Sequence, residues 1–578
     1  MAAGSPEAET VRVAVAQFGA GLDAGENLAT CLRMIDQAAA EKPQLIVLPE
    51  FLNHASWWRD EEHSYAVAVA LDGPFLSAIA AKAGEHHCYI MANCTVRRRN
   101  NAVTDTNILF DPTGRQVAAS DKQVLMGNEN NFLEPAQEVS PVVDTPIGRI
   151  AMYSCMDGVI PETARGLALR GAQILCNSLN SFAADEATLH IPVRAAENKV
   201  FVVAANKVGP LVPEESRAAV AERLKIAPED LNGAGESQIV APDGTILAKC
   251  AANGEEVAVA DIVVTEADAK VRPDGTDLFA ARRPDLYAPI AAEATTRNAP
   301  AAAEKIEAAI FVPSSFGQSG LDEAAKAVVE AGEAGIDLLV LPELFFAADG
   351  AIDDPAEAAD FSDLATDALH AAVRGGGSGC AVTTTLVERS GDGFSHTGVL
   401  IGGDGVRLRQ RQLHACARHD PWCSAFGDGI ESADLDWGRL ALVIGGDAVF
   451  PETFRLAALK DAQVAAVPTR LLEAWELETG FPERAAENRM SLVVASPSGP
   501  DDAGAIIAID HVTLWSGERE GPFDGHLNNP VVTRARGAPG LTRAPVHPAR
   551  AANREITHRT DVVANRPWWL AQAITAPL

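Results

Sequence analysis

The chain has 578 residues, 47% of them hydrophobic, so it is long enough for two or more globular domains with ordinary cores. Its formal net charge of −32 disfavours nucleic acids and anionic membranes as partners, because their phosphates would be repelled over most of the surface. No apolar run approaches the roughly 20 residues that span a bilayer, and the start of the chain has no leader-like pattern. We therefore expect a cytoplasmic protein that acts on a small molecule, with its nine scattered cysteines reduced.

Taken in chain order, the first half alternates apolar runs with segments of helical spacing. Strands are predicted at 11–18, 44–50, 88–96, 107–114, 149–154, 173–179 and 200–208, and helices at 26–42, 74–84, 162–172 and 188–199. This alternation predicts a layered α/β domain in which strand ends deliver polar residues into a crevice. Residues 212–237 are polar and are expected to form an insertion loop.

The second half repeats this pattern in the same order. "QLIVLPEF" (44–51) returns as "DLLVLPEL" (337–344), and "VRAAENKVFVVAANKVGP" (193–210) returns as "ERAAENRMSLVVASPSGP" (483–500). "IAMYSCMDGVIPETARGLALRGAQIL" (150–175) is matched by "LALVIGGDAVFPETFRLAALKDAQVA" (440–465). We interpret this as a tandem duplication. The predicted domains are 1–287 and 308–578, joined by an Ala- and Pro-rich linker at 288–307. Residues 515–558, rich in Arg, Pro and Gly, are expected to wrap the surface or to be partly disordered.

Cys155 is the first candidate for chemistry. It ends an apolar strand and precedes a turn into a helix that begins near Pro161. A thiol near a helix N-terminus can have its pKa lowered, which favours the nucleophilic thiolate. Because free cysteines are also among the most buried residues, a packing role is the alternative.

Glu50 and Lys122 are the next candidates. Glu50 closes an apolar strand, where partial desolvation can raise a carboxyl pKa toward the range of a general base. Lys122 follows a predicted hairpin and would stabilise a developing oxyanion. The alternatives are a salt-bridged strand end for Glu50 and a solvated surface position for Lys122.

Together, "LPEF", "SDKQVLMGNENNFLEP" and "YSCMDGVIPETARGLALRGA" resemble the carbon-nitrogen hydrolase family, the nitrilase superfamily, over residues 11–287. The resemblance implies an αββα sandwich in each repeat, with Glu50 as general base, Lys122 as oxyanion stabiliser and Cys155 as nucleophile. It also implies that Glu129 positions substrate or lysine. The backbone N–H of Met156 is expected to share the oxyanion, and no cofactor or metal is required.

The second repeat retains Glu343 but carries Gly445 in place of Cys155. Lys122 aligns with Arg411, although Arg409 competes, and Glu129 aligns with Arg418. We expect residues 308–578 to be catalytically inactive. Since members of the family commonly assemble through a two-fold interface, this repeat is expected to pair with the first within the chain, and further homo-oligomers are open. A competing interpretation of "LHACARHDPWC" is a zinc site; its metal-ligand types are His414, Cys416, His419 and Cys423.

The sequence "CMDGVIPE" is similar to the amidase-like branches and favours a small amide as substrate. His54, Trp57 and Trp58 are expected either to line the pocket or to pack at the domain junction. An N-carbamyl amine, a nitrile, acyl transfer by the same triad and a non-catalytic regulatory role remain alternatives.

Overall fold

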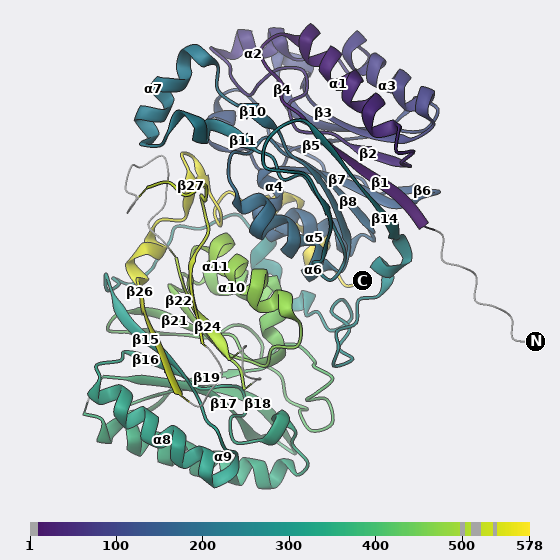
Figure 1. The fold of residues 1–578 in the computed structure, drawn as a ribbon. Helices are drawn as coiled ribbons and strands as arrows, with labels where there is room; N and C mark the ends of the chain where they lie inside the picture. The colour runs from purple at the N-terminus through teal and green to yellow at the C-terminus, as the bar shows by residue number, and fades with distance from the viewer. Residues whose placement is uncertain (1–9, 378, 498–502, 510–521, 536–539) are drawn as a thin grey trace, which may run out of the picture. The chain divides into compact units, whose positions relative to one another are not determined.

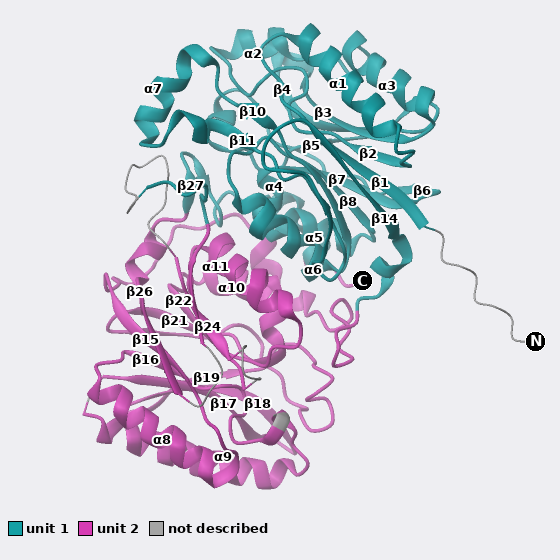
Figure 2. Ribbon diagram, in the orientation of Figure 1, with its two compact units in different colours: residues 1–270, 512–528, 555–574 teal, residues 271–511, 529–554, 575–578 magenta. Residues whose placement is uncertain are grey.

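The computed structural model describes residues 10–377, 379–497, 503–509, 522–535 and 540–578 (Figure 1). The chain forms two compact units (Figure 2). Unit 1 comprises Met1–Lys270, Val512–Asn528 and Glu555–Ile574, and unit 2 comprises Val271–His511, Asn529–Arg554 and Thr575–Leu578. Each unit therefore contains chain from both repeats, because residues 271–287 belong to unit 2 and residues 522–528 and 555–574 belong to unit 1. The two units are defined by which residues pack together, whereas the predicted domains are defined by the sequence repeat. The units therefore do not test the predicted domain boundaries, and 1–287, 288–307 and 308–578 stay a prediction.

Unit 1 contains two six-stranded sheets. The first has the order β14-β1-β2-β3-β4-β5 and the second β13-β12-β9-β8-β7-β6. The strands of the first sheet are β1 (Thr10–Gln17), β2 (Leu45–Val47), β3 (Tyr89–Arg97), β4 (Val103–Phe110), β5 (Gln116–Asp121) and β14 (Glu256–Val263). Those of the second are β6 (Val143–Thr145), β7 (Gly148–Ser154), β8 (Ile174–Ser178), β9 (Phe201–Ala205), β12 (Gln238–Val240) and β13 (Ile246–Lys249).

The two sheets of unit 1 face each other across an apolar core. Val13, Met91, Met152 and Val203 belong to this core and are buried. Helices α1 (Ala24–Ala39) and α3 (Pro74–His86) cover the other face of the first sheet, and α5 (Pro161–Leu169) and α6 (Ile191–Asn198) pack against the second (Figure 1). Strands β8 and β9 are buried along their whole length, and α1 buries one side through Cys31, Met34, Ile35 and Ala38, which fits this layering. It confirms the predicted αββα arrangement.

Shorter elements complete unit 1. They are α2 (Glu61–Val67), α4 (Met156–Val159), α7 (Glu214–Leu224), β10 (Val208–Pro210), β11 (Asn232–Ala234), β27 (Glu555–Thr557), β28 (Thr560–Asp561) and α12 (Gln572–Thr575), whose last residue belongs to unit 2. The predicted insertion loop at 212–237 contains α7, whose Val220 and Leu224 are buried with Leu231 and Leu527. This segment therefore carries a small core of its own.

Unit 2 repeats the architecture. Its sheets have the orders β19-β18-β17-β16-β15-β26 and β20-β21-β22-β23-β24-β25. The strands are β15 (Ile306–Val312), β16 (Leu338–Val340), β17 (Ala381–Ser390), β18 (Gly393–Gly402), β19 (Gly405–Arg411), β20 (Ser432–Leu435), β21 (Gly438–Leu442), β22 (Val464–Pro468), β23 (Ser491–Ala495), β24 (Gly504–Ala508), β25 (Val531–Arg534) and β26 (Gly540–Val546). Helices α8 (Gly317–Glu333) and α9 (Pro355–Gly375) cover the first sheet, and α10 (Pro451–Leu459) and α11 (Phe481–Asn488) lie beside the second.

The expectation for residues 515–558 is wrong for the part that the structure describes, while 515–521 and 536–539 lie outside the described residues. β26 pairs antiparallel with β15 along Ile306–Val312, and β25 pairs with β24. Each is the strand at one edge of its sheet, so it pairs with a neighbour on one side only. Polar and charged side chains are common on such edge strands. In the described residues, no helix is both long and apolar enough to cross a membrane.

Candidate active site

The structure brings together Glu50, Lys122 and Glu129, all predicted from the sequence. Lys122 directly follows β5, and its Nζ lies 2.8 Å from Glu50 Oε1 and 2.9 Å from Glu129 Oε2. The side chain of Lys122 is fully buried, and that of Glu50 is 1% exposed. A buried ammonium is stable only when it is paired and hydrogen-bonded, and this lysine has two such partners.

Cys155 ends β7 in a strained backbone conformation. Its φ of 44° and ψ of −107° lie where a residue with a Cβ rarely sits. Its N–H donates to Asn177 Oδ1 at 3.0 Å and to the Ser178 carbonyl at 2.9 Å, so the turn is held by β8. Met156 begins α4 immediately afterwards, which makes its N–H one of those that a helix leaves without an internal acceptor. Strain of this kind is often found at catalytic positions.

The electrostatics of the site differ from one expectation. Burial raises the pKa of Cys155 well above its usual value, Glu50 raises it further, and Lys122 opposes both. The predicted lowering of this pKa by the helix N-terminus is therefore wrong for the resting site, because the thiol is 4% exposed and faces nearby carboxylates. Burial alone would lower the pKa of Lys122, but Glu129 and Glu50 raise it well above its usual value. The lysine stays charged and the thiol stays protonated at neutral pH.

Asp157 ties the two halves of the site together. Its carboxylate accepts the N–H groups of Gln123 at 3.0 Å and Val124 at 2.8 Å, directly after Lys122, and it follows Cys155 by two residues. Ser154 N–H donates to the same carboxylate at 3.3 Å. The nucleophile and the lysine are therefore held in one hydrogen-bonded frame.

Two acidic residues near the site were missed by sequence reasoning. Asp105 lies on β4 with an oxygen 3.8 Å from Lys122 Nζ, and burial together with Glu50 raises its pKa well above its usual value. Glu186 Oε1 lies 4.0 Å from Cys155 Sγ. The only sequence signal for Asp105 was a carboxylate inside the otherwise uncharged run "VTDTNILF". Glu186 follows a loop whose course the sequence does not reveal.

A cavity of about 570 Å³ lies in unit 1. Its lining includes Trp57, Met126, Asn128, Asn180 and Phe182. Met126 N–H donates to the Glu129 carboxylate at 2.9 Å, and Asn180 follows the Ser178 that holds Cys155, so the cavity adjoins the segments that carry the site. Thr557 and His558 also line it.

The other two side chains expected at the pocket do not line this cavity. Trp58 is buried against Phe51 and Phe132. His54 is also buried, with its Nδ1 2.7 Å from the Ala55 carbonyl. Of the three residues considered from the sequence, Trp57 is the one with access to a small ligand.

Unit 2 corrects the alignment of the second repeat by one residue. Lys122 N–H donates to the Asp105 carbonyl at 2.8 Å, and Gln412 N–H donates to the His396 carbonyl at 2.9 Å in the same way. Asp447 accepts the next two N–H groups of the chain in unit 2, as Asp157 does in unit 1. Gln412 therefore replaces Lys122, and the predicted match to Arg411 is wrong.

The same register places His419 opposite Glu129. The N–H of Glu129 donates to the Met126 carbonyl, and the N–H of His419 donates to the Cys416 carbonyl, in each case three residues earlier. The carbonyls of Glu129 and His419 both accept the N–H of the residue four positions later. The predicted match of Glu129 to Arg418 is wrong by one position, whereas Gly445 does replace Cys155, with a φ of 51° in the same kind of turn.

The four residues considered as a zinc site do not converge. His414 Nδ1 lies 2.8 Å from Asp447, Cys416 Sγ lies 3.6 Å from Asp274, and Cys423 lies near the Ala425 carbonyl at 3.9 Å. His419 instead faces Glu343, with 2.8 Å between its Nε2 and Oε1.

The chain is similar to known proteins over about half of its length. A nitrilase from Pyrococcus abyssi is 28% identical over 279 residues, which cover 48% of this chain and 99% of that protein. A deaminated glutathione amidase from Mus musculus is 26% identical over 294 residues, 48% of this chain and 84% of the relative. A solved amidase structure from Nesterenkonia sp. has 22% identity and a TM-score of 0.37, and the match covers 46% of this chain and 96% of that one. The carbon-nitrogen hydrolase family model matches residues 12–270 and 313–515, more than half of the chain, and the chain therefore belongs to the carbon-nitrogen hydrolase family of enzymes.

Proposed function

We propose that unit 1 hydrolyses the C–N bond of a small amide through a thioester on Cys155. The observation that carries this proposal is the buried constellation in which Lys122 Nζ contacts both Glu50 and Glu129 while Cys155 occupies a strained turn within their electrostatic reach. A positively charged donor, a carboxylate base and a thiol are the groups that acyl transfer from an amide needs.

In this mechanism Glu50 accepts the thiol proton as Cys155 Sγ attacks the carbonyl carbon. Lys122 Nζ and the Met156 N–H stabilise the oxyanion. As the oxyanion collapses, the C–N bond breaks and Glu50 passes the proton to the departing ammonia or amine. Water then attacks the thioester while Glu50 takes its proton, the C–S bond breaks, and the acid leaves with the thiol restored.

Glu129 is assigned a positioning role. Its Oε1 accepts from Lys122 Nζ at 3.0 Å, and its Oε2 lies 2.9 Å from the same Nζ and accepts the Met126 N–H at 2.9 Å. These contacts hold the ammonium toward Glu50 and fix the loop that adjoins the cavity. Asp105 is a third acid beside the lysine, and burial together with Glu50 raises its pKa well above the usual value.

Unit 2 is proposed to be catalytically inactive, because Gly445 supplies no nucleophile and Gln412 no charge. The amide is favoured over the N-carbamyl amine and the nitrile by the "CMDGVIPE" pattern around Cys155. Among the relatives, one is named an amidase and one a nitrilase, so both chemistries belong in the test.

The test is intact-mass spectrometry with ammonia detection on a panel of small amides, N-carbamyl amines and nitriles. We expect an acyl adduct and ammonia release with an amide for the natural sequence, and neither for Cys155→Ala. A panel with added amine acceptors separates hydrolysis from acyl transfer, because transfer gives the new amide in place of the acid. Turnover that survives in Cys155→Ala would refute the thioester route.

A further inference from the structure

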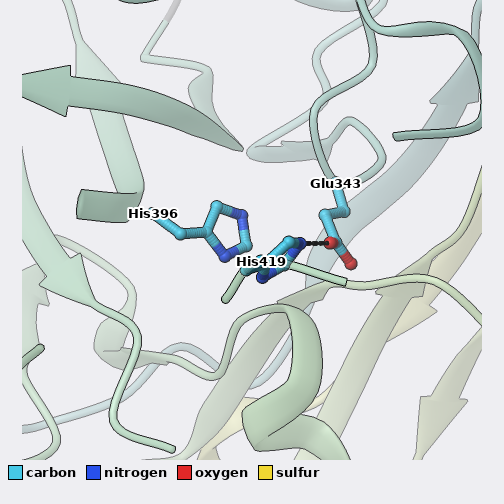
Figure 3. A group of neighbouring side chains, drawn as sticks. All are labelled: Glu343, His396 and His419. Carbon is cyan, nitrogen blue, oxygen red and sulfur yellow. Dashed lines mark ion pairs between the residues drawn. The ribbon is translucent and has the colours of Figure 1, made fainter. Parts of the chain in front are cut away.

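Three metal-ligand side chains converge in unit 2 at the positions that correspond to part of the unit 1 site. Glu343, His396 and His419 each offer a ligand atom, and these atoms all lie within 4.8 Å of one another (Figure 3). Glu343 is 1% exposed and both histidines are fully buried. By the register described above, His396 and His419 stand where unit 1 has Asp105 and Glu129.

Gln412 determines which ring nitrogens face this cluster. Its Oε1 lies 2.7 Å from His396 Nδ1 and 2.6 Å from His419 Nδ1. Its Nε2 donates to the His414 carbonyl at 2.6 Å, which fixes the orientation of the amide. Because a carbonyl oxygen only accepts, both Nδ1 atoms carry the proton, and the Nε2 lone pairs are left for another partner.

Those groups lack an adequate partner within the described part of the chain. His396 Nε2 and Glu343 Oε2 are buried without a hydrogen bond there. Arg418 Nη1 contacts Glu343 Oε1 at 3.1 Å, and His419 Nε2 faces the same oxygen. Arg418 therefore compensates the carboxylate charge through Oε1, but leaves Oε2 and an imidazole lone pair unsatisfied. Burying such groups without a partner is unfavourable.

We propose that Glu343, His396 and His419 bind one divalent first-row transition metal ion, such as Zn²⁺. Two imidazole nitrogens and a carboxylate are ligands that such ions prefer. Metal-bound histidines characteristically donate their other ring N–H to a neighbouring acceptor, and here Gln412 Oε1 provides that acceptor for both rings. The competing occupant is a proton on His419 that pairs it with Glu343.

The comparison of the two units shows how the same place in the fold differs between them. In unit 1, Lys122 supplies the positive charge at the centre of a cluster of carboxylates. In unit 2, the uncharged Gln412 replaces it and two imidazoles replace two of the acids. The substitution converts a site that holds an ammonium group into one that offers lone pairs to a cation.

The test uses the full chain with Cys155→Ser, so that the unit 1 thiol cannot bind the probe. Zn²⁺ is titrated calorimetrically into chelator-treated protein, and Co²⁺ is added separately to read its visible absorption. We expect one Zn²⁺ per chain and a Co²⁺ spectrum with nitrogen and oxygen ligands. His396→Ala and Glu343→Gln are expected to weaken Zn²⁺ binding by more than about 100-fold, and Gln412→Ala by about 10–100-fold. His370→Ala, at a partly buried histidine on α9 outside the cluster, is the matched control and keeps full affinity.

The Cys155→Ser protein itself keeps the test decisive if a ligand variant fails to fold. Zn²⁺ at 100 times its Kd should raise its unfolding free energy by about 2.7 kcal/mol, measured as a rise in Tm. Absence of Zn²⁺ and Co²⁺ binding by folded Cys155→Ser protein overturns the proposal and leaves the His419–Glu343 ion pair. Binding that persists unchanged in His396→Ala and Glu343→Gln overturns it as well.

Discussion

Cys155 and Gly445 occupy the same turn in the two units, with φ values of 44° and 51°. The backbone that strains a cysteine in unit 1 is thus retained in unit 2, where glycine adopts it without cost. A Cβ at position 445 would lie 2.7 Å from His396 Cε1 and 3.1 Å from its Nδ1. In unit 2, the imidazole of His396, a residue of the proposed metal site, therefore occupies the space that a nucleophilic side chain at position 445 would need.

This relationship predicts the effect of Gly445→Ala. We expect the change to reduce unfolding free energy by about 2–4 kcal/mol, because it adds a close contact to the cost of a positive φ. Gly335→Ala is the matched control in unit 2, since its φ of 72° is also positive but no atom lies within 4 Å of the added Cβ. Denaturant unfolding measures both; equal losses would show that His396 does not obstruct position 445. Gly445→Cys is expected to restore no activity to a Cys155→Ala chain.

Lys122→Met is expected to abolish turnover and to destabilise unit 1 by about 3–5 kcal/mol at neutral pH. The change leaves Glu50, Asp105 and Glu129 buried without their cation. Burial already raises the pKa of Asp105 and of Glu129, so without the lysine the folded state binds more protons than the unfolded state. Stability then falls as pH rises, and the deficit should shrink on acidification toward pH values near the unfolded pKa of the acids. Urea unfolding across pH checks this; a deficit that is independent of pH would contradict it.

Alkylation of Cys155 by iodoacetamide is expected to be slow at neutral pH and to accelerate into the alkaline range, because burial and then Glu50 raise the thiol pKa. Glu50→Gln removes the negative charge, so the half-maximal rate should move to lower pH. Intact mass gives the rate, and Cys155→Ala identifies the labelled residue among the nine cysteines. An unchanged or higher midpoint in Glu50→Gln would contradict the proposed electrostatics.

Thr560→Val should weaken catalysis through the loop that carries Glu129. The Thr560 hydroxyl accepts the Gly127 N–H at 3.0 Å and donates to the Leu125 carbonyl at 3.1 Å, and it is buried. Valine keeps the shape but removes the acceptor of the buried Gly127 N–H, at a cost of about 1–3 kcal/mol, whereas the Leu125 carbonyl still accepts from Asn130 Nδ2 at 3.2 Å. We expect a lower kcat/KM in steady-state kinetics, while Thr188→Val, at an exposed threonine in the same unit, leaves it unchanged. Equal kcat/KM values for the two variants would show that Thr560, in the C-terminal segment, does not support catalysis through this loop.

A fragment of residues 1–270 is expected to be unstable and poorly active. It lacks the segments that donate the Leu527 and Asn528 N–H groups to the buried Asp185 carboxylate, at 2.8 and 2.6 Å. Co-expression with residues 271–578 supplies those segments and should restore activity. Circular dichroism and ammonia release measure the outcome, and a stable, fully active fragment alone would show that unit 1 does not depend on them.

The sequence by itself indicated the family and the αββα layers, and it predicted Glu50, Lys122, Glu129 and Cys155 as site residues. The layered α/β pattern follows from local signals such as apolar strands that end in a polar residue and the Pro-Glu-Thr helix start, whereas the αββα sandwich and the roles of the four residues are what the resemblance of the motifs to the family implies. Such signals depend on near neighbours in the chain, so they survive without knowledge of the fold.

Only the tertiary structure decided which residues replace the lysine and the second glutamate in unit 2. Successive side chains of a strand point to opposite faces, so a shift of one residue exchanges Arg411 for Gln412 at the site, and the shorter β18–β19 hairpin hid the register. Only the fold brings His396 and His419 to Glu343, and only packing assigns the last strands and the C-terminal hairpin to their units. These are long-range relationships, set by sheet pairing and burial rather than by any local pattern of residues.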